Sequence, residues 1–342
     1  MAKLDPLFPI FDPQPRHSPL ALAADAAPLD STGCLTEYRP IQTRSMLSKV
    51  VTRRNLPFTH AINPYRGCEF ACRYCYARYA HEFLERTPEE FERKIYMKQN
   101  GAWLLAQELS RLKPGTEIAL GTATDPYQPI ERRQKITRSL LEIFAKTSGF
   151  SLGIVTKSTL IARDIDLLTE IARRHRLTIC HTVTTMNVKL ARVLEPRAPR
   201  PDLRIRTLAR MREAGLRAGV LCSPLMPGIT DSRRSIDAVA RAAKAADAKF
   251  FSSGPLFLKP CSLPTFFQFV AENFPQQLAA YKQRYGSSAW VSVEYRKRVG
   301  DLVQSICREH KLGSRYDDAS PAASPSVEPP VLLESQPWLP FA

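Results

Sequence analysis

Six apolar segments of strand length alternate with segments of helix length along the middle of the chain. This alternation limits the possible folds more than any other feature. Strands are expected at 58–62, 117–121, 151–155, 177–183, 218–222 and 249–253, and helices at 103–112, 136–145, 165–174, 203–213, 235–246 and 264–284. Strands that are each followed by a helix predict an α/β fold, with a parallel sheet and helices outside it. Six units are too few for a closed eight-stranded barrel.

The loop after the first expected strand contains three cysteines in the spacing C-x3-C-x2-C. They are Cys68, Cys72 and Cys75, in the string NPYRGCEFACRYCYAR. Thiolates suit zinc and iron–sulfur centres. Cysteines buried on one helix face are an alternative, although the proline and glycine before the motif favour a loop. A zinc site closed by His81 is a second alternative. An iron–sulfur cluster held by three thiolates would keep one iron open for chemistry.

Nothing in the sequence predicts a membrane protein. No apolar run approaches the roughly 18 residues that a membrane helix needs. The first residues, MAKLDPLFPIFDPQP, lack the apolar core of a signal peptide. We therefore expect a cytoplasmic protein with no membrane partner. Cysteines stay reduced in that compartment, which favours a metal role for the three clustered cysteines over disulfides.

The positive charge is concentrated in the middle of the chain. The formal net charge is +16, while residues 1–45 carry −1 and residues 311–342 carry −2, which leaves +19 on residues 46–310. An excess of this size suggests an anionic partner, with nucleic acid as the leading candidate. A basic surface that serves only solubility is the alternative. Among the paired arginines, Arg132 and Arg133 follow the string TDPYQPIE and are expected near the site.

Composition divides the chain into four segments. Residues 1–45 are rich in proline and small residues, which predicts an irregular N-terminal arm. Residues 46–290 contain the strand–helix units and form the predicted core. Residues 291–317 are expected to be a helical extension. Residues 318–342 are rich in proline and are predicted to be a disordered tail.

Ligands of parallel α/β folds bind beyond the carboxyl ends of the strands. The three cysteines follow the first expected strand, and the string TATDPYQPIE follows the second. Lys157 comes after the third strand, Thr184 near the end of the fourth, and Cys261 in the loop after the sixth. We therefore expect these side chains to meet at one rim of the sheet.

The cysteine spacing, with Tyr74 just before the last cysteine, resembles the signature of the radical SAM superfamily. The strings NPYRGC and YCYAR, followed by TDPYQPIE, resemble the branch of spore photoproduct lyase and its uncharacterised relatives. The resemblance covers roughly residues 55–260. It implies an open parallel (β/α)6 partial TIM barrel with irregular N- and C-terminal extensions. It also implies an enzyme that cleaves S-adenosylmethionine to a 5′-deoxyadenosyl radical, which abstracts hydrogen from substrate.

The resemblance also implies roles for single residues. Cys68, Cys72 and Cys75 would bind a [4Fe–4S] cluster whose open iron chelates S-adenosylmethionine. The residues implied to bind that cofactor are Tyr76 at the adenine or ribose, Thr124 with Asp125 after the second strand, Lys157 at the methionyl carboxylate and Thr184 at the ribose. An electron donor such as a flavodoxin or ferredoxin would be a partner.

One position departs from the lyase pattern. Thr122 stands where the lyase has a hydrogen-donor cysteine, and a hydroxyl gives up a hydrogen atom much less readily than a thiol. Cys261 is the candidate replacement, although a free cysteine often only packs. The substrate is therefore open between a nucleic-acid lesion and a small metabolite or protein side chain. A zinc-stabilised nucleic-acid-binding protein without catalysis is a further alternative.

Overall fold

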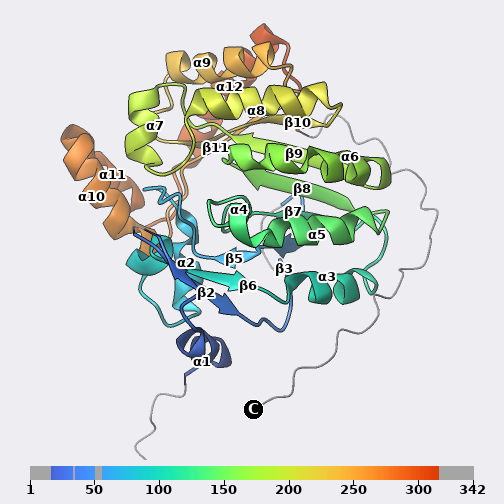
Figure 1. Ribbon diagram of the computed structural model, residues 1–342. Coiled ribbons are helices and arrows are strands. Elements are labelled where there is room, and N and C mark those ends of the chain that lie inside the picture. Colours follow the sequence, from blue (N-terminus) through green and yellow to red (C-terminus); the bar gives the residue numbers. More distant parts are fainter. Residues whose placement is uncertain (1–16, 34, 51–55, 316–342) are drawn as a thin grey trace, which may run out of the picture.

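The computed structural model describes residues 17–33, 35–50 and 56–315, and its main feature is a seven-stranded sheet (Figure 1). The strand order is β11-β10-β9-β8-β7-β4-β3. Six strands run parallel: β4 (His60–Ile62), β7 (Glu117–Leu120), β8 (Ser151–Thr156), β9 (Arg176–Thr182), β10 (Ala218–Leu225) and β11 (Phe251–Pro255). Consecutive members of the six pair with one another along the sheet, as in a barrel. The predicted α/β fold with a mostly parallel sheet is confirmed and is consistent with an open partial TIM barrel; β3 (Leu47–Lys49) is an unpredicted antiparallel edge strand.

Helices cover the outer face of the sheet, and Figure 1 shows α5, α6, α8 and α9 side by side there. The longer helices are α3 (Gly101–Leu109), α5 (Ile136–Ala145), α6 (Ile165–Arg174), α8 (Pro201–Glu213), α9 (Arg233–Ala245) and α12 (Val293–His310). Helices α5 and α6 have the predicted bounds. The predicted helix 264–284 is divided into α10 (Leu263–Asn273) and α11 (Leu278–Tyr285). The shorter helices are α2 (Tyr79–Glu82), α4 (Glu131–Gln134) and α7 (Val188–Leu194).

Residues 1–16 of the predicted irregular arm lie outside the described residues, and the part from residue 17 on is more ordered than its composition predicts. Helix α1 (Pro19–Ala26) begins with Ser18 as N-cap and proline at its first position, where no amide hydrogen is needed. A small sheet of order β1-β2-β6-β5 follows, made of β1 (Ser31–Thr32), β2 (Glu37–Ile41), β5 (Tyr65–Arg66) and β6 (Lys94–Lys98). The expectation of an irregular arm is therefore wrong for α1 and β2. Strand β2 forms because β6, more than fifty residues away, supplies its partner.

The C-terminal part of the described chain packs back on the barrel. Helix α12 lies against α9, and Phe250 forms a parallel bridge with Gly313. The predicted tail, 318–342, lies outside the described residues, and the four segment boundaries stay predictions. Among the described residues, no helix has both the length and the apolar character that crossing a membrane requires.

Candidate active site

The cysteine loop begins at the carboxyl end of β4 and is held against the segment before β6. Gly67 has φ +84°, and a Cβ atom there would lie 2.6 Å from the Lys94 carbonyl oxygen and 2.7 Å from that of Phe91. The Cys68 amide donates to the same Phe91 oxygen at 2.9 Å. Only glycine allows this close approach. The glycine therefore fixes how the chain enters the loop that presents the three thiols.

Two residues from other rim loops fix the cysteine loop in place. The buried Gln128, from the string TDPYQPIE, donates its side-chain amide to the Gly67 carbonyl at 3.3 Å. Its oxygen accepts from the Glu69 amide at 2.9 Å. Ser262, after β11, donates its hydroxyl to the Cys75 carbonyl at 2.8 Å. The loop is thus tied to the segments after the second and sixth parallel strands, which confirms that these segments share one rim.

Asp125 connects the ends of β7 and β8. Its carboxylate accepts hydrogen bonds from the Thr156 hydroxyl at 2.7 Å and from the Lys157 amide at 2.7 Å. It also accepts from the Tyr127 amide at 2.9 Å, and its own amide donates to the Cys68 sulfur. The carboxylate is therefore used to position neighbouring backbone. Thr124 beside it is buried, with its hydroxyl directed at the Tyr65 carbonyl, 3.4 Å away.

A buried ionic network lies behind Cys72. Glu195 and Arg204 are each 1% exposed at the side chain, and a guanidinium nitrogen lies 2.5 Å from a carboxylate oxygen. Tyr74 donates its hydroxyl to Glu195, and the Thr184 hydroxyl donates to the same oxygen at 3.0 Å. The Lys157 ammonium lies 5.8 Å from the Tyr74 ring centroid. Sequence reasoning found Lys157 and Thr184 but missed Glu195 and Arg204, because neither belongs to a motif.

The charges of this network act on the thiols. Burial raises the pKa of Cys72 to about 12, although the Lys157 cation opposes the shift. Burial also raises the pKa of Cys68 and Cys75, with Arg78 opposing it at Cys75. For Lys157, burial disfavours the ammonium, yet the negative charges of Cys72 and Glu195 raise its pKa overall. Three buried thiols of this kind become thiolates most readily when a metal centre supplies the positive charge.

The cysteine loop offers three soft sulfur donors, a set that suits zinc and iron–sulfur centres. Across the part of the chain that the structure describes, no three His, Cys, Asp or Glu side chains converge closely enough to hold one metal ion. His81, the proposed fourth zinc ligand, packs its ring on Phe91 and directs Nε2 at the Lys94 carbonyl, 3.0 Å away. His81 thus has a structural contact of its own, and the three thiols are the soft donors that an iron–sulfur cluster takes.

The other expected rim residues lie around the same loop. Tyr76 is 38% exposed and donates its hydroxyl to the Thr122 carbonyl. Its ring centroid lies 5.8 Å from that of Phe257. Cys261 neighbours Ser262, which contacts the cysteine loop directly, so its thiol is near Cys75. Thr122 accepts from the Asn63 side-chain amide at 3.2 Å.

Comparisons with known proteins agree on the family. A family model described as the Radical SAM superfamily matches residues 62–239. An uncharacterised protein of Mycobacterium tuberculosis strain H37Rv is 31% identical over 294 residues, which are 85% of this chain and 86% of that protein. An uncharacterised protein of Methanocaldococcus jannaschii is 29% identical over 177 residues, covering 50% of this chain and 62% of its own.

Solved structures of spore photoproduct lyase share the fold. One lyase structure aligns with a TM-score of 0.59 at 18% identity, covering 81% of this chain and 80% of the lyase. Another, solved with bound AdoMet and a dinucleoside spore photoproduct, aligns with a TM-score of 0.56 at 15% identity, covering 80% and 79%. At these identities the likeness concerns the architecture alone.

Proposed function

Since this chain belongs to the radical SAM superfamily, we propose that Cys68, Cys72 and Cys75 hold a [4Fe–4S] cluster that acts on S-adenosylmethionine. When bound there, such a cluster would supply the electron for reductive cleavage of S-adenosylmethionine to methionine and a 5′-deoxyadenosyl radical, the species that would take a hydrogen atom from substrate. The remaining work belongs to the protein, which binds and orients the reactants and limits access of water.

One observation carries the proposal. Lys157 follows β8, its ammonium lies 5.8 Å from the Tyr74 ring centroid, and its charge acts on the Cys72 thiol, near the buried Glu195–Arg204 pair. A cation held beside a metal-binding thiol suits a ligand that bears a carboxylate. We assign Lys157 to the methionyl carboxylate for this reason.

The other cofactor contacts are assigned by position on the rim. Tyr76, partly exposed beside Cys75, is assigned to the adenine or ribose, and Thr124 to the cofactor beside Asp125. Thr184 is assigned to the ribose; its hydroxyl is also bonded to Glu195, so it would link the ribose to the buried network. Asp125 is assigned a positioning role, because its carboxylate accepts a hydrogen bond from the backbone amide of Lys157.

The substrate is proposed to be a nucleic-acid lesion, in line with the +19 charge of residues 46–310 and the shared fold with a lyase solved with a dinucleoside photoproduct. Cys261 is the proposed hydrogen donor, because Thr122 occupies the position at which the lyase has its donor cysteine. A flavodoxin or ferredoxin is the proposed electron donor, and the proposed location is the cytoplasm. A small metabolite or a protein side chain is the second candidate substrate, because Thr122 departs from the lyase pattern. A non-catalytic zinc protein is not retained, since the family match favours an enzyme.

The test compares Cys72→Ala with Cys307→Ala, which changes a half-buried thiol on α12. After anaerobic treatment with iron and sulfide, wild type and Cys307→Ala should each contain about four iron and four sulfide per chain. Both should release 5′-deoxyadenosine from S-adenosylmethionine when dithionite is added, measured by chromatography. Cys72→Ala should do neither. One zinc and no sulfide in the wild type, or full iron in Cys72→Ala, would contradict the proposal.

A further inference from the structure

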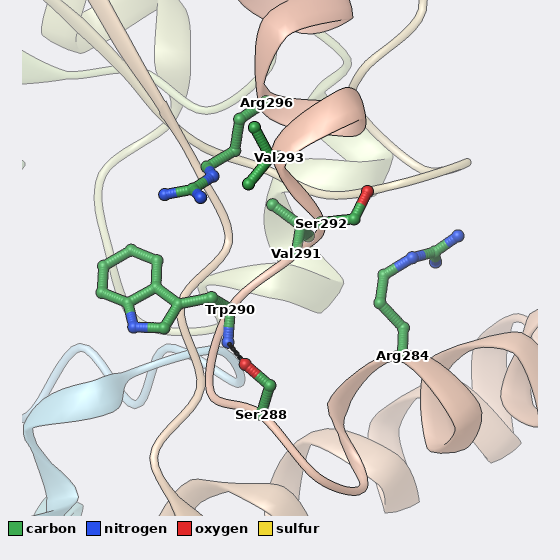
Figure 2. Close-up of a pocket in the computed structure, with 7 residues that line it drawn as sticks. All are labelled: Arg284, Ser288, Trp290, Val291, Ser292, Val293 and Arg296. Carbon is green, nitrogen blue, oxygen red and sulfur yellow. Dashed lines mark hydrogen bonds between the residues drawn. The ribbon is translucent and has the colours of Figure 1, made fainter.

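Two arginines line a surface pocket of about 730 Å³ between the end of α11 and the start of α12, drawn in Figure 2. The guanidinium groups of Arg284 and Arg296 point in different directions there, so they do not form a joint site for one small anion. Arg296 also acts on the carboxylate of Glu294. A cation with a clearer lack of partners lies beside the cysteine loop.

Arg78, the last residue of the string YCYAR, has no role in the proposed function. It ends the short 3-10 helix η1 (Tyr76–Arg78) and follows Cys75 by one turn of chain. Its side chain is 0% exposed. Arginines are almost never fully buried unless they are paired, because the guanidinium keeps its charge and all five of its N–H groups need acceptors. The burial of Arg78 therefore calls for a physical reason.

Only one of the three guanidinium nitrogens of Arg78 has a partner among the described residues. Nη1 donates to the Glu92 carboxylate at 2.5 Å and to the Pro88 carbonyl at 2.9 Å, both in the 3-10 helix η2 (Pro88–Glu92). Nε and Nη2 are buried and have no hydrogen-bond partner in the described chain. These two nitrogens form one edge of the planar group, with two parallel N–H bonds. A whole edge of a buried cation thus lacks the acceptors that burial normally requires.

The groups around Arg78 place it next to the metal-binding thiols. Its guanidinium carbon lies 6.0 Å from the ring centroid of Phe91. Burial disfavours the charged guanidinium, yet the pKa of Arg78 is raised by Glu92 and by the negative charges of Cys75 and Cys72. Burial raises the pKa of the Cys75 thiol, and Arg78 is the charge that opposes this most strongly. The partly unpartnered cation is therefore beside the cysteine loop, on the side of Cys75.

We propose that Arg78 donates its open edge to sulfur atoms on the Cys75 side of the bound iron–sulfur cluster and thereby raises the reduction potential of that cluster. Hydrogen bonds to the sulfur atoms and nearby charge are among the factors that set such potentials. A cation favours the reduced form, because reduction adds one negative charge. Arg78 thus makes it easier for the proposed flavodoxin or ferredoxin to deliver its electron. The inference rests on the proposed function, since it needs a cluster at the three cysteines.

Glu92 gives the inference a test of sign. Its side chain is 14% exposed, and its carboxylate compensates part of the charge of Arg78. Removal of the arginine should lower the reduction potential, whereas removal of the Glu92 charge should raise it. If Arg78 served only to tie η1 to η2, either change would loosen the same contact. Shifts of opposite sign are therefore expected from an electrostatic role and not from a structural one.

The midpoint potential is measured by anaerobic potentiometric titration of the reconstituted holoprotein, without S-adenosylmethionine, followed by the electron paramagnetic resonance signal of the reduced cluster. Arg78→Met should make reduction about tenfold less favourable, which is about 59 mV for one electron. Glu92→Gln keeps an oxygen acceptor for Nη1 and should shift the potential upward. Arg78→Lys keeps the charge but loses the planar two-donor edge, so its potential should lie between those of the wild type and Arg78→Met.

Arg138→Met is the matched control, because Arg138 on α5 is also paired with a buried carboxylate, that of Asp164 at 2.7 Å. Its midpoint potential should equal that of the wild type. Iron and sulfide analysis, with circular dichroism, shows that each variant is loaded and folded.

The inference is overturned by an unchanged potential in loaded Arg78→Met, or by a Glu92→Gln shift in the same direction as that of Arg78→Met. If Arg78→Met does not load, Glu92→Gln decides, and a potential equal to or below that of the wild type overturns the inference. A wild type that binds no cluster overturns the proposed function as well. Unchanged potentials in loaded variants that still release 5′-deoxyadenosine overturn this inference alone.

Discussion

Lys98 is a buried cation whose removal should stabilise the protein. It lies in β6 and is 5% exposed. Arg66, on the adjacent strand β5, is on the same face, because it pairs with Tyr96, two residues before Lys98. Burial and then repulsion by Arg66 lower the pKa of Lys98 from 10.5 to about 7, and Glu108 opposes this only in part. The fold therefore disfavours the ammonium form that the unfolded chain prefers.

The pH dependence follows from the lowered pKa. Below about pH 7 Lys98 is charged in the folded protein, and the whole free-energy cost of burying its ammonium group lowers stability. Between about pH 7 and pH 10.5 the unfolded chain binds more protons than the folded protein, so the free energy of unfolding rises with pH. At about 1.4 kcal/mol per pH unit, the penalty is about 5 kcal/mol at pH 6 and about 1 kcal/mol at pH 10. Lys98→Met should therefore raise the free energy of unfolding by several kcal/mol at the lower pH and by much less at the higher.

Urea unfolding of wild type and Lys98→Met at the two pH values measures this difference. The control is Lys113→Met, at an exposed lysine after α3, which should change stability by less than about 0.5 kcal/mol at either pH. Because each variant is compared with wild type at the same pH, titration of other groups cancels. A Lys98→Met effect that is the same at both pH values, or destabilising at both, refutes the reasoning.

Two further predictions concern the network behind the cysteine loop. Arg204→Met should lower the free energy of unfolding by about 3–5 kcal/mol, because Glu195 is left buried without its partner; Arg206→Met, at an exposed pair on the same helix, should cost less than about 1 kcal/mol in the same urea titration. Lys157→Ala should retain its iron and sulfide but bind S-adenosylmethionine roughly tenfold more weakly by calorimetry, as loss of a charged hydrogen bond predicts; unchanged affinity would rule out the carboxylate role.

The barrel could be predicted from the sequence because its pattern is local. In α5, the buried Ile136, Leu140, Leu141 and Phe144 recur at helical spacing, and the helix has the predicted bounds. The same holds for strands such as β8, where alternate residues are buried. Once the strands are parallel and consecutive, the rim follows from topology. The convergence of Asp125, Lys157 and the cysteine loop was therefore predictable without knowledge of any contact.

The small sheet and the buried network were not predictable, because both depend on contacts between distant segments. Strand β2 contains Pro40 and has no strong strand pattern, and it forms by pairing with β6. Glu195 and Arg204 belong to no sequence motif, yet each side chain is 1% exposed. Arg133 was expected near the site as part of a basic surface, and it contacts Asp30 of a segment predicted to be irregular. In each case the sequence gives the residue type, but the role of the residue depends on a contact with a residue or strand that is distant in the sequence.

The cysteine loop illustrates how these two kinds of information combine. Its motif specifies three thiols, but the positions of those thiols depend on residues outside the motif. Gln128 and Ser262 hold the loop's backbone from two other rim segments, and Tyr38 in β2 donates to Glu69 within the loop at 2.6 Å. The N-terminal sheet is therefore part of the support for the proposed cluster site. The same carboxylate accepts from the Ile130 amide at 3.0 Å, which joins that sheet to the segment after β7. A site built in this way keeps its geometry only when the barrel, the small sheet and the rim loops are all in place.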